Sequence, residues 1–450
     1  MRSTKDLTAL LEGTLQRSPA DETELVARGY DSSLTRFAGS TIHQNVHEDD
    51  TSLIVRVVVG KRLGVVSTNR LEPEAVDKAV SRAIEIAKQT PEEPDFPGLP
   101  KADPASEVDS YSAQSAAMTP ADRADGVAKA VAEAGEGDIK LYGAYRVSST
   151  RLVVANTSGT NQAYDGTDAF LSVFAIDDNG ISGSASGYAI GAESLDPAAL
   201  AAVAVEKCKA AADPVTVAPE PIDVILEPRA ISEILEWFNF TSFGAKQVQE
   251  GQSFMAGRAG RRVMGENISI YDDGLDPEGI PIPFDFEGVP KRRVNLVENG
   301  VVGGPVYDSM TAAKDGVEST GHATPAVFRG GPSPSNLFIS AGDDSREDLL
   351  KSVRRGLLVT RFHYVNGMLD TRKALFTGMT RDGTYLIEDG KLTRAVKNMR
   401  FNESMLKALS QVEGITKERE TAGRNWGGIG SVTAPTLLIR GFRFTGSTDF

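Results

Sequence analysis

The first part of the chain switches between helical and strand-like hydrophobic patterns. Leucines spaced three and four apart over residues 5–17 predict a short amphipathic helix. Residues 22–68 then read as strands separated by polar or glycine turns, in the pieces ETELVAR, SLTRFAGSTIHQNVHE, TSLIVRVVVG and RLGVVST. Residues 74–88 return to helical spacing, with Pro73 suited to the first turn. We therefore expect an α/β domain over residues 1–90, with antiparallel strands covered by helices.

The middle of the chain repeats this order after a proline-rich stretch. Segment 91–106 contains five prolines, which predicts a surface linker or an extended crossover. A helix should begin after Thr119, which can cap it, because Pro120 fits the first helical position. Strand-like segments follow, and an alanine-rich helix is expected over roughly 196–211. The sequence thus predicts a central α/β domain over 91–215, packed with the first.

The remaining residues, 216–450, read as a third, β-rich domain. Helical patterns are predicted at 229–240 and 401–409, and the segment 322–340 is expected to be a long Gly/Pro loop. The strand-like stretches are separated by Arg-Asp-Gly and Glu-Asp-Gly, which are typical turn sequences. The fold class predicted is α+β: an N-terminal α/β part with an antiparallel sheet, followed by a β-rich C-terminal domain.

Composition narrows the function classes. The chain has 450 residues and a formal net charge of −14, and its basic clusters are short and isolated. Phosphate repels an acidic surface, so direct nucleic-acid binding is not expected. The sequence has no apolar run long enough for a membrane span, and its charged first residues predict no secretory signal. One cysteine, Cys208, excludes an intrachain disulfide and fits a reducing compartment, so we expect a cytoplasmic protein.

The four histidines do not form a known zinc motif. His43 and His47 are four residues apart, but glutamine, asparagine and valine stand between them, so the internal Glu of H-E-x-x-H is missing and Glu48 follows instead. The stretch is strand-like, so we expect surface or sheet-packing side chains. His322 and His363 are isolated, and an isolated histidine is usually structural or exposed.

Nucleophilic and phosphate-binding motifs are also lacking. The sequence contains no G-x-S-x-G, no G-x-x-x-x-G-K-[ST] and no G-x-G-x-x-G that opens a helix. Cys208 lies in an alanine-rich helical pattern, and Asp343 and Asp344 precede a predicted helix start, where capping explains them. The residues alone indicate an acidic α/β protein with no visible active site.

Several stretches, in order along nearly the whole chain, resemble the TldD/PmbA metallopeptidase family. They are LTRFAGSTIHQNVHED and GKRLGVVSTN near the start, then PIPFDFEGVPKRRVNLVENGVV, GLLVTRFHYVN and FTGMTRDGTYLIEDGKLTRAVKNMRFNES. The last two are similar to the final domain of the PmbA (TldE) branch. The chain is therefore identified as a PmbA/TldE-type member.

The resemblance also places the catalytic motif of the family. The catalytic branch carries an H-E-x-x-x-H helix and a later cysteine, a ligand set suited to zinc with an open position for water. The matching positions here are Glu236, Trp237 and Thr241, and the C-terminal stretch RNWGGIGSVTAPTLLIRG has no cysteine. The resemblance thus implies no catalytic residue, no metal ligand and no cofactor in this chain, with zinc expected only in a catalytic partner.

The resemblance implies a function that does not depend on zinc ligands in this chain. In this family the TldE-type chain is thought to pair with a zinc-bearing TldD-type subunit, and the pair degrades or trims unfolded peptides; the family is also associated with DNA gyrase modulation. Peptidase activity would then require the partner. Two alternatives stay open: a homodimeric peptide-binding or scaffold protein without a protease partner, and an unconventional hydrolase that uses His43, His47 or His322.

Overall fold

The N-terminal half folds around one long antiparallel sheet. The computed structural model describes residues 2–328, 330–424 and 429–447. The strand order of this sheet is β3-β2-β1-β4-β5-β6. Its strands are β1 (Glu22–Ala38), β2 (Thr41–Val59), β3 (Arg62–Thr68), β4 (Lys140–Asn156), β5 (Asn161–Ile176) and β6 (Ser182–Ala189). Because β1 pairs with β4 along most of its length, residues on both sides of the proline-rich segment belong to the same sheet.

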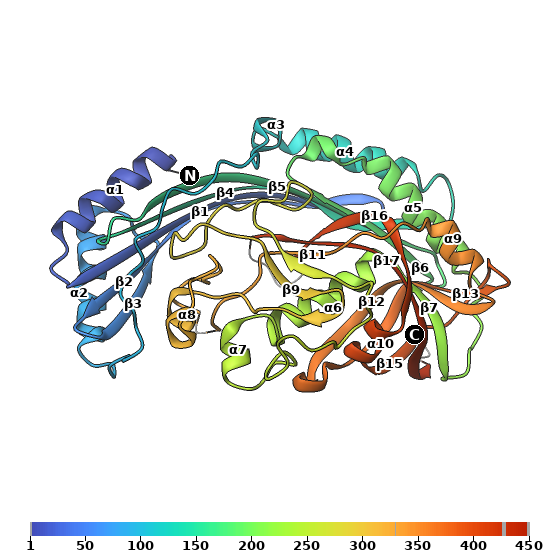
Figure 1. Ribbon diagram of the computed structural model, residues 1–450. Helices are drawn as coiled ribbons and strands as arrows, with labels where there is room; N and C mark the ends of the chain where they lie inside the picture. The colour runs from blue at the N-terminus through green and yellow to red at the C-terminus, as the bar shows by residue number, and fades with distance from the viewer. Residues whose placement is uncertain (1, 329, 425–428, 448–450) are drawn as a thin grey trace.

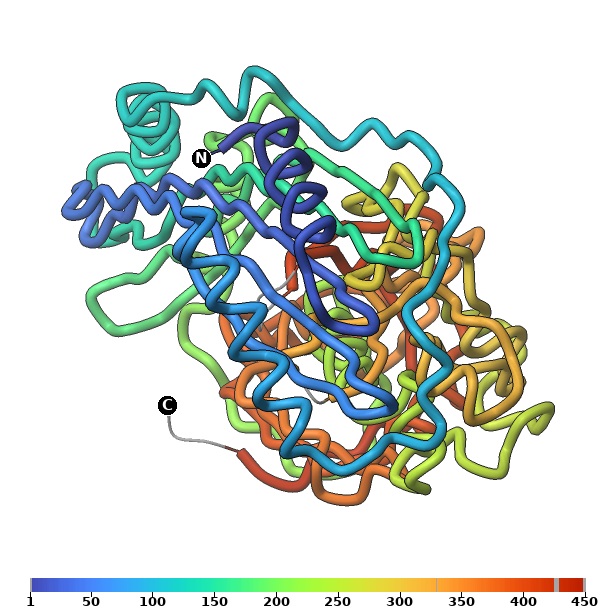
Figure 2. The backbone as a smooth tube through the Cα atoms, turned by 90° about the vertical axis from the view of Figure 1, so that its left-hand side faces the viewer, coloured from blue at the N-terminus to red at the C-terminus, as the bar shows by residue number. Residues whose placement is uncertain are grey.

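Helices cover the outer face of this sheet, as Figure 1 shows. The helices α1 and α2 pack over β1 and β2, and α4 and α5 pack over β4 to β6. Their bounds are α1 (Thr4–Arg17), α2 (Pro73–Ala87), α3 (Ala113–Ala116), α4 (Pro120–Ala132) and α5 (Pro197–Ala210), with a short 3-10 turn η1 (Ala192–Ser194) before α5. The segment between α2 and α3 runs along the outside of the molecule without regular structure (Figure 2). The predicted helices and the extended proline-rich segment are confirmed.

The strand boundaries in 22–68 differ from the prediction. Residues ETELVARGYDSSLTRFA form one continuous strand, β1. Side chains on both faces of β1 are buried, and the polar stretch in its middle stays paired with β2 and β4. The turn falls instead at Gly39 and Ser40, whose φ angles of 58° and 61° are the left-handed values of a two-residue hairpin turn. The piece predicted as a single strand, SLTRFAGSTIHQNVHE, is therefore the tip of a hairpin.

The C-terminal domain is β-rich, which confirms the predicted fold class. The strands β7 (Pro221–Leu226), β12 (Arg355–Asp370), β13 (Leu375–Glu388), β15 (Met399–Ser404) and β17 (Ser431–Ser447) pair in that order, and β17 pairs with β7 to close a ring. The remaining strands extend the sheet: β8 (Ile270–Asp272), β9 (Val294–Glu298), β10 (Val301–Val302), β11 (Asn336–Ile339), β14 (Lys391–Ala395) and β16 (Val412–Gly423). The helical elements are α6 (Pro228–Thr241), α7 (Ala245–Gln249), α8 (Ser309–Asp315), α9 (Arg346–Lys351), α10 (Met405–Ser410) and η2 (Thr371–Lys373).

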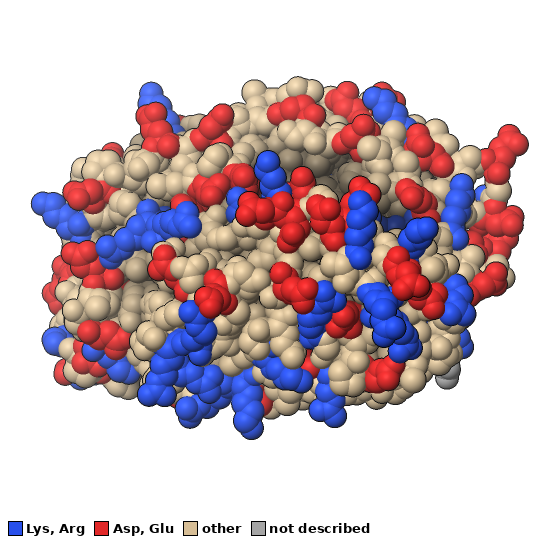
Figure 3. Space-filling model, turned by 45° about the vertical axis from the view of Figure 1, so that its right-hand side comes forward, with Lys and Arg blue, Asp and Glu red and all other residues tan. Residues whose placement is uncertain are grey.

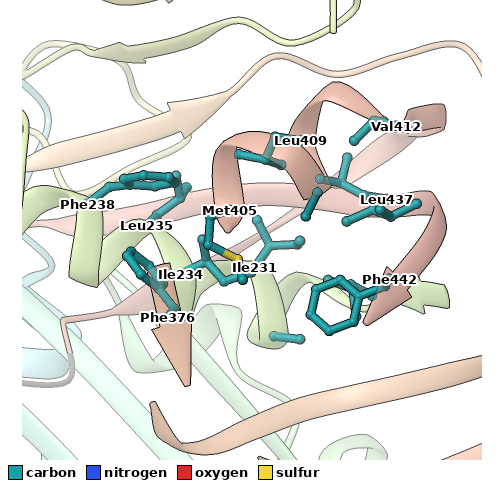
Figure 4. Close-up of a cluster of buried hydrophobic side chains, with 14 of the residues drawn as sticks. Ile231, Ile234, Leu235, Phe238, Phe376, Met405, Leu409, Val412, Leu437 and Phe442 are labelled. Carbon is teal, nitrogen blue, oxygen red and sulfur yellow. The ribbon is translucent and has the colours of Figure 1, made fainter. Parts of the chain in front are cut away.

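The helix α6 is the central packing element of this domain. Its apolar side chains, including Ile231, Ile234, Leu235 and Phe238, lie among residues from the surrounding strands and α10 (Figure 4). Phe238 contacts Phe376 with ring centroids 5.3 Å apart. Burial of each such side chain contributes about 1.5–3 kcal/mol, so this cluster fixes the position of α6 within the ring.

Three local predictions in the C-terminal domain are wrong. The Arg-Asp-Gly sequence is not a turn: Asp382 and Gly383, with φ of 54° and 130°, lie inside β13 where its register against β12 shifts. Residues 401–404 continue β15, and the short helix starts only at Met405. The expected Gly/Pro loop 322–340 ends in strand β11, which pairs with β8 and β17.

The surface carries charges of both signs. On the face in Figure 3, lysines and arginines are interspersed with acidic residues, and the upper part of that face is hollowed. No helix in the described part of the chain is long and apolar enough to cross a membrane.

Candidate functional site

The helix α6 carries the three positions that the resemblance singles out. Pro228 occupies its first turn, where a missing N–H costs nothing, and Arg229, Ser232 and Glu233 lie on the face toward the N-terminal sheet. Glu236, Trp237 and Thr241 all lie in the buried second half of the helix.

Glu236 is held by an arginine from a distant segment. Its carboxylate Oε1 accepts from Arg424 Nε at 3.2 Å, and Arg424 also donates from Nη1 to the Pro334 carbonyl at 2.8 Å. The Glu236 side chain is 4% exposed and the Arg424 side chain 17%. Burial raises the pKa of Glu236, and Arg424 opposes that rise. The guanidinium therefore supplies the positive charge that a buried carboxylate requires.

Trp237 and Thr241 make packing and backbone contacts. The Trp237 ring lies edge-on to Phe240 with centroids 6.0 Å apart, and it packs against β12 beside Gly367, where an added Cβ would come within 3.0 Å of the indole. The Thr241 hydroxyl donates to the Trp237 carbonyl at 2.7 Å, a bond one turn back along the helix. Both side chains thus stabilise the end of α6.

These three side chains do not fit a zinc ion. The carboxylate of Glu236 is bonded to a guanidinium, an indole N–H has no lone pair to offer a metal, and the Thr241 hydroxyl is turned to the backbone. Within the described residues, no three His, Cys, Asp or Glu side chains group so that they could hold a metal ion.

The four histidines lie in separate settings. His43 and His47 are exposed on β2, and His47 Nδ1 lies 3.0 Å from the Ser33 hydroxyl. His322 is fully buried, with Nε2 2.6 Å from Asp272 Oδ1. His363 lies on β12 beside Tyr364, ring centroids 4.3 Å apart. The structure does not bring His43, His47 and His322 together into one site.

A cavity separates α6 from the N-terminal sheet. Its volume is about 340 Å³, and it lies between β1, β4, β5 and β6 on one side and α6, β12 and the end of β16 on the other. Arginines from both walls line it, among them Arg28, Arg229 and Arg424. The sequence analysis did not identify them. For Arg28 the sequence did offer a signal. Side chains of a strand alternate between its two faces, so Arg28 lies on the same face of β1 as the buried Glu24 and Val26.

A buried cluster of ion pairs also joins the two halves of the chain. Arg56 on β2 donates to Glu24 Oε2 at 2.7 Å and to Glu287 Oε1 at 3.0 Å, and all three side chains are nearly inaccessible. Burial raises the pKa of Glu24 to about 7, although Arg56 opposes that rise. Glu287 belongs to the C-terminal domain, so this cluster fixes the sheet against it.

The sequence matches three family domains in order. They are described as PmbA/TldA metallopeptidase domain 1 over residues 23–87, the central domain over 107–211 and the C-terminal domain over 219–446. The last match alone covers more than half of the chain.

Individual proteins of this family are similar to the chain in sequence or in fold. A protein of Haemophilus influenzae named as a metalloprotease TldD homolog is 29% identical over 171 residues, which is 37% of this chain and 35% of that protein. The match spans 42% of the length of two further curated relatives. TldE from Thermococcus kodakarensis has a similar fold, with a TM-score of 0.85 at 22% identity over 99% of this chain and all of that one. So does a Thermotoga maritima protein described as a proposed modulator of a DNA gyrase, with a TM-score of 0.87 at 22% identity over 98% of this chain and all of that one.

Since a family domain matches more than half of the sequence and the other two match in order before it, the chain belongs to the PmbA/TldD metallopeptidase family.

Proposed function

We propose that this chain is the non-catalytic, TldE-type subunit of a cytoplasmic TldD/TldE-type metallopeptidase complex that degrades or trims unfolded peptides. The observation that carries the proposal is the buried pair of Glu236 with Arg424. At the helix where the catalytic branch is expected to hold zinc, this chain has a carboxylate neutralised by its own guanidinium, so this part of α6 is built for stability rather than for metal binding.

The role proposed for the chain is structural. The zinc and the hydrolytic water would belong to a TldD-type partner, which is similar in shape, so that two related surfaces could pair about a pseudo-two-fold axis. The TldE-type chain would then form one wall of a chamber and restrict entry to extended peptides. Substrate backbone could also add to an exposed strand edge, where main-chain hydrogen bonds give affinity without reading side chains.

The test is reconstitution with the TldD-type subunit of the same organism. We expect the two chains to co-elute as a complex, and hydrolysis of an unfolded peptide to require both. Zinc should be stoichiometric in the partner and far below one per chain in this protein when each is purified alone. Glu236→Ala is expected to confer no new metal binding on this chain.

Three outcomes would overturn the proposal. If the partner alone cleaves peptides as fast as the mixture, the chain is not a required subunit. If this chain forms a stable homodimer that binds peptides and never associates with the partner, the scaffold alternative holds. Hydrolysis by this chain alone, lost in a His43→Ala/His47→Ala variant, would favour the unconventional hydrolase.

A further inference from the structure

The cavity between α6 and the N-terminal sheet is built from both halves of the chain. Arg28 and Tyr30 of β1, with residues of β4 to β6, form one wall, and α6 and Arg361 of β12 form the other. Each wall comes from one half of the chain, so the cavity forms only where the two halves meet. A volume of about 340 Å³ is at the lower end of the range for small-molecule sites, so it suits a short chain end rather than a folded segment.

Arginines outnumber acids in this cavity. Three of the five lining arginines have a carboxylate partner: Arg146 with Asp168 at 2.7 Å, Arg424 with Glu236 at 3.2 Å, and Arg361 with Asp382. The other two, Arg28 and Arg229, form no ion pair with any residue in the described part of the chain. Only two acids, Asp168 and Glu233, line the cavity itself, against five arginines.

The two arginines without ion pairs are the unusual feature. Arg28 Nε is buried and has no hydrogen-bond partner in the structure, and the guanidinium lies 5.7 Å from the centre of the Tyr30 ring. Arg229 donates to the Ser186 hydroxyl, a neutral partner. Burial lowers the pKa of Arg28, and burial together with the nearby charge of Arg361 lowers that of Arg229. Asp168 acts on Arg28, and Glu233 acts on Arg229, only from beyond ion-pair distance. A largely buried guanidinium without a directly bonded anion is costly, so the site suits a negatively charged ligand.

The shape of the guanidinium groups and the rest of the lining indicate which anion. The planar fork of arginine matches the two oxygens of a carboxylate. Beside the arginines stand the aromatic rings of Tyr30, Phe170 and Tyr188, the last two in edge-on contact at 6.4 Å. An apolar or aromatic side chain next to the carboxylate would pack there.

We propose that this cavity binds the free carboxylate at the C-terminal end of a peptide, with Arg28 and Arg229 as the groups that recognise it. The site would hold a peptide by its end and leave the rest of the chain outside. This inference does not rest on the proposed subunit role: a chain that bound such peptides but never associated with a TldD-type partner would support it while overturning that role.

The experiment compares one peptide in two forms. The probe is the tripeptide glycyl-alanyl-phenylalanine with an N-terminal fluorophore, either as the free acid or as the C-terminal amide, and binding to the full chain is followed by fluorescence anisotropy. We expect the acid to bind at least about tenfold more tightly, because a charge-assisted hydrogen bond is lost in the amide. Equal affinity of the two forms would overturn the proposal, whatever any variant does.

Variants locate the site. Arg28→Met and Arg229→Met should each reduce the preference for the acid by about tenfold. Arg36→Met is the matched control, because Arg36 lies exposed on the same strand as Arg28, outside the cavity, and should leave the preference unchanged. Thermal unfolding of each variant checks that it is folded. A folded Arg28→Met/Arg229→Met protein with an unchanged acid preference would refute the assignment.

Competition identifies the anion. N-acetylphenylalanine should displace the labelled peptide, and inorganic phosphate at the same concentration should displace it far less. If phosphate is the better competitor, the site recognises phosphate and the carboxylate proposal is wrong.

Discussion

Removal of the Arg424 side chain is the most direct test of how α6 is stabilised. In Arg424→Met the Glu236 carboxylate would stay buried at 4% exposure without its cation. Breaking a buried ion pair from one side costs about 3–5 kcal/mol, and loss of the 2.8 Å hydrogen bond to the Pro334 carbonyl adds about 1 kcal/mol. Glu236→Gln removes the charge but keeps the shape, so we expect the double variant Glu236→Gln/Arg424→Met to be more stable than Arg424→Met alone.

The pH dependence separates this mechanism from simple loss of packing. Burial raises the pKa of Glu236, and without Arg424 that rise is larger. A carboxyl group whose folded pKa lies above its unfolded pKa contributes stability below the unfolded value and loses it as pH rises through the folded value. The defect of Arg424→Met should therefore be small near pH 4.5 and grow toward pH 8, relative to the wild-type protein.

The assay is urea unfolding at pH 5 and pH 8, followed by tryptophan fluorescence, with Arg82→Met as control. Arg82 forms an exposed pair with Glu85 on α2, so its loss should change little at either pH. A defect of Arg424→Met that is equal at both pH values, or that persists unchanged in the double variant, would refute the reasoning.

Two further predictions concern the contacts between the halves of the chain. Burial raises the pKa of Glu24 to about 7 in the folded protein, so the free energy of unfolding should fall as pH rises from about 4.5 to 7. In Glu24→Gln this decrease should disappear from a series of thermal unfolding curves measured across that pH range. An unchanged dependence on pH would contradict the assignment. Gly166→Ala places a Cβ 2.0 Å from the Tyr164 hydroxyl, which donates to the Pro281 carbonyl at 3.0 Å. We expect a loss of about 1–3 kcal/mol, whereas Gly137→Ala, which meets nothing within 4 Å, should be nearly neutral; equal unfolding midpoints for the two variants would argue against that contact.

The elements that local chemistry specifies were predictable from the sequence. The capping box of Thr119 and Asp122, with Pro120 between them, fixes the start of α4 as expected. The apolar spacing of α2 and α6 likewise predicts their location, because the residues on the buried face of a helix recur every three or four positions. The family resemblance is confirmed by the three matching domains.

The features that depend on distant partners were not predictable. The polar middle of β1 reads as a turn, and only its pairing with β2 and β4 keeps it extended. The bulge at Asp382 and Gly383 resembles a hairpin turn locally, but it directs Asp382 toward Arg361 and the Ser182 hydroxyl. The contact of Arg424 with Glu236 joins residues 188 positions apart, and nothing in the local sequence of either indicates it.

The closure of the C-terminal ring has a consequence for how the protein is made. The strand β7 pairs with β17, which follows roughly 200 residues later, so the ring stays open until nearly all of the C-terminal domain has left the ribosome. The N-terminal sheet is complete at β6 and can form much earlier. During that interval the open edges of β7 and β15 could pair with other chains, and the acidic net charge of −14 would oppose such association through mutual repulsion.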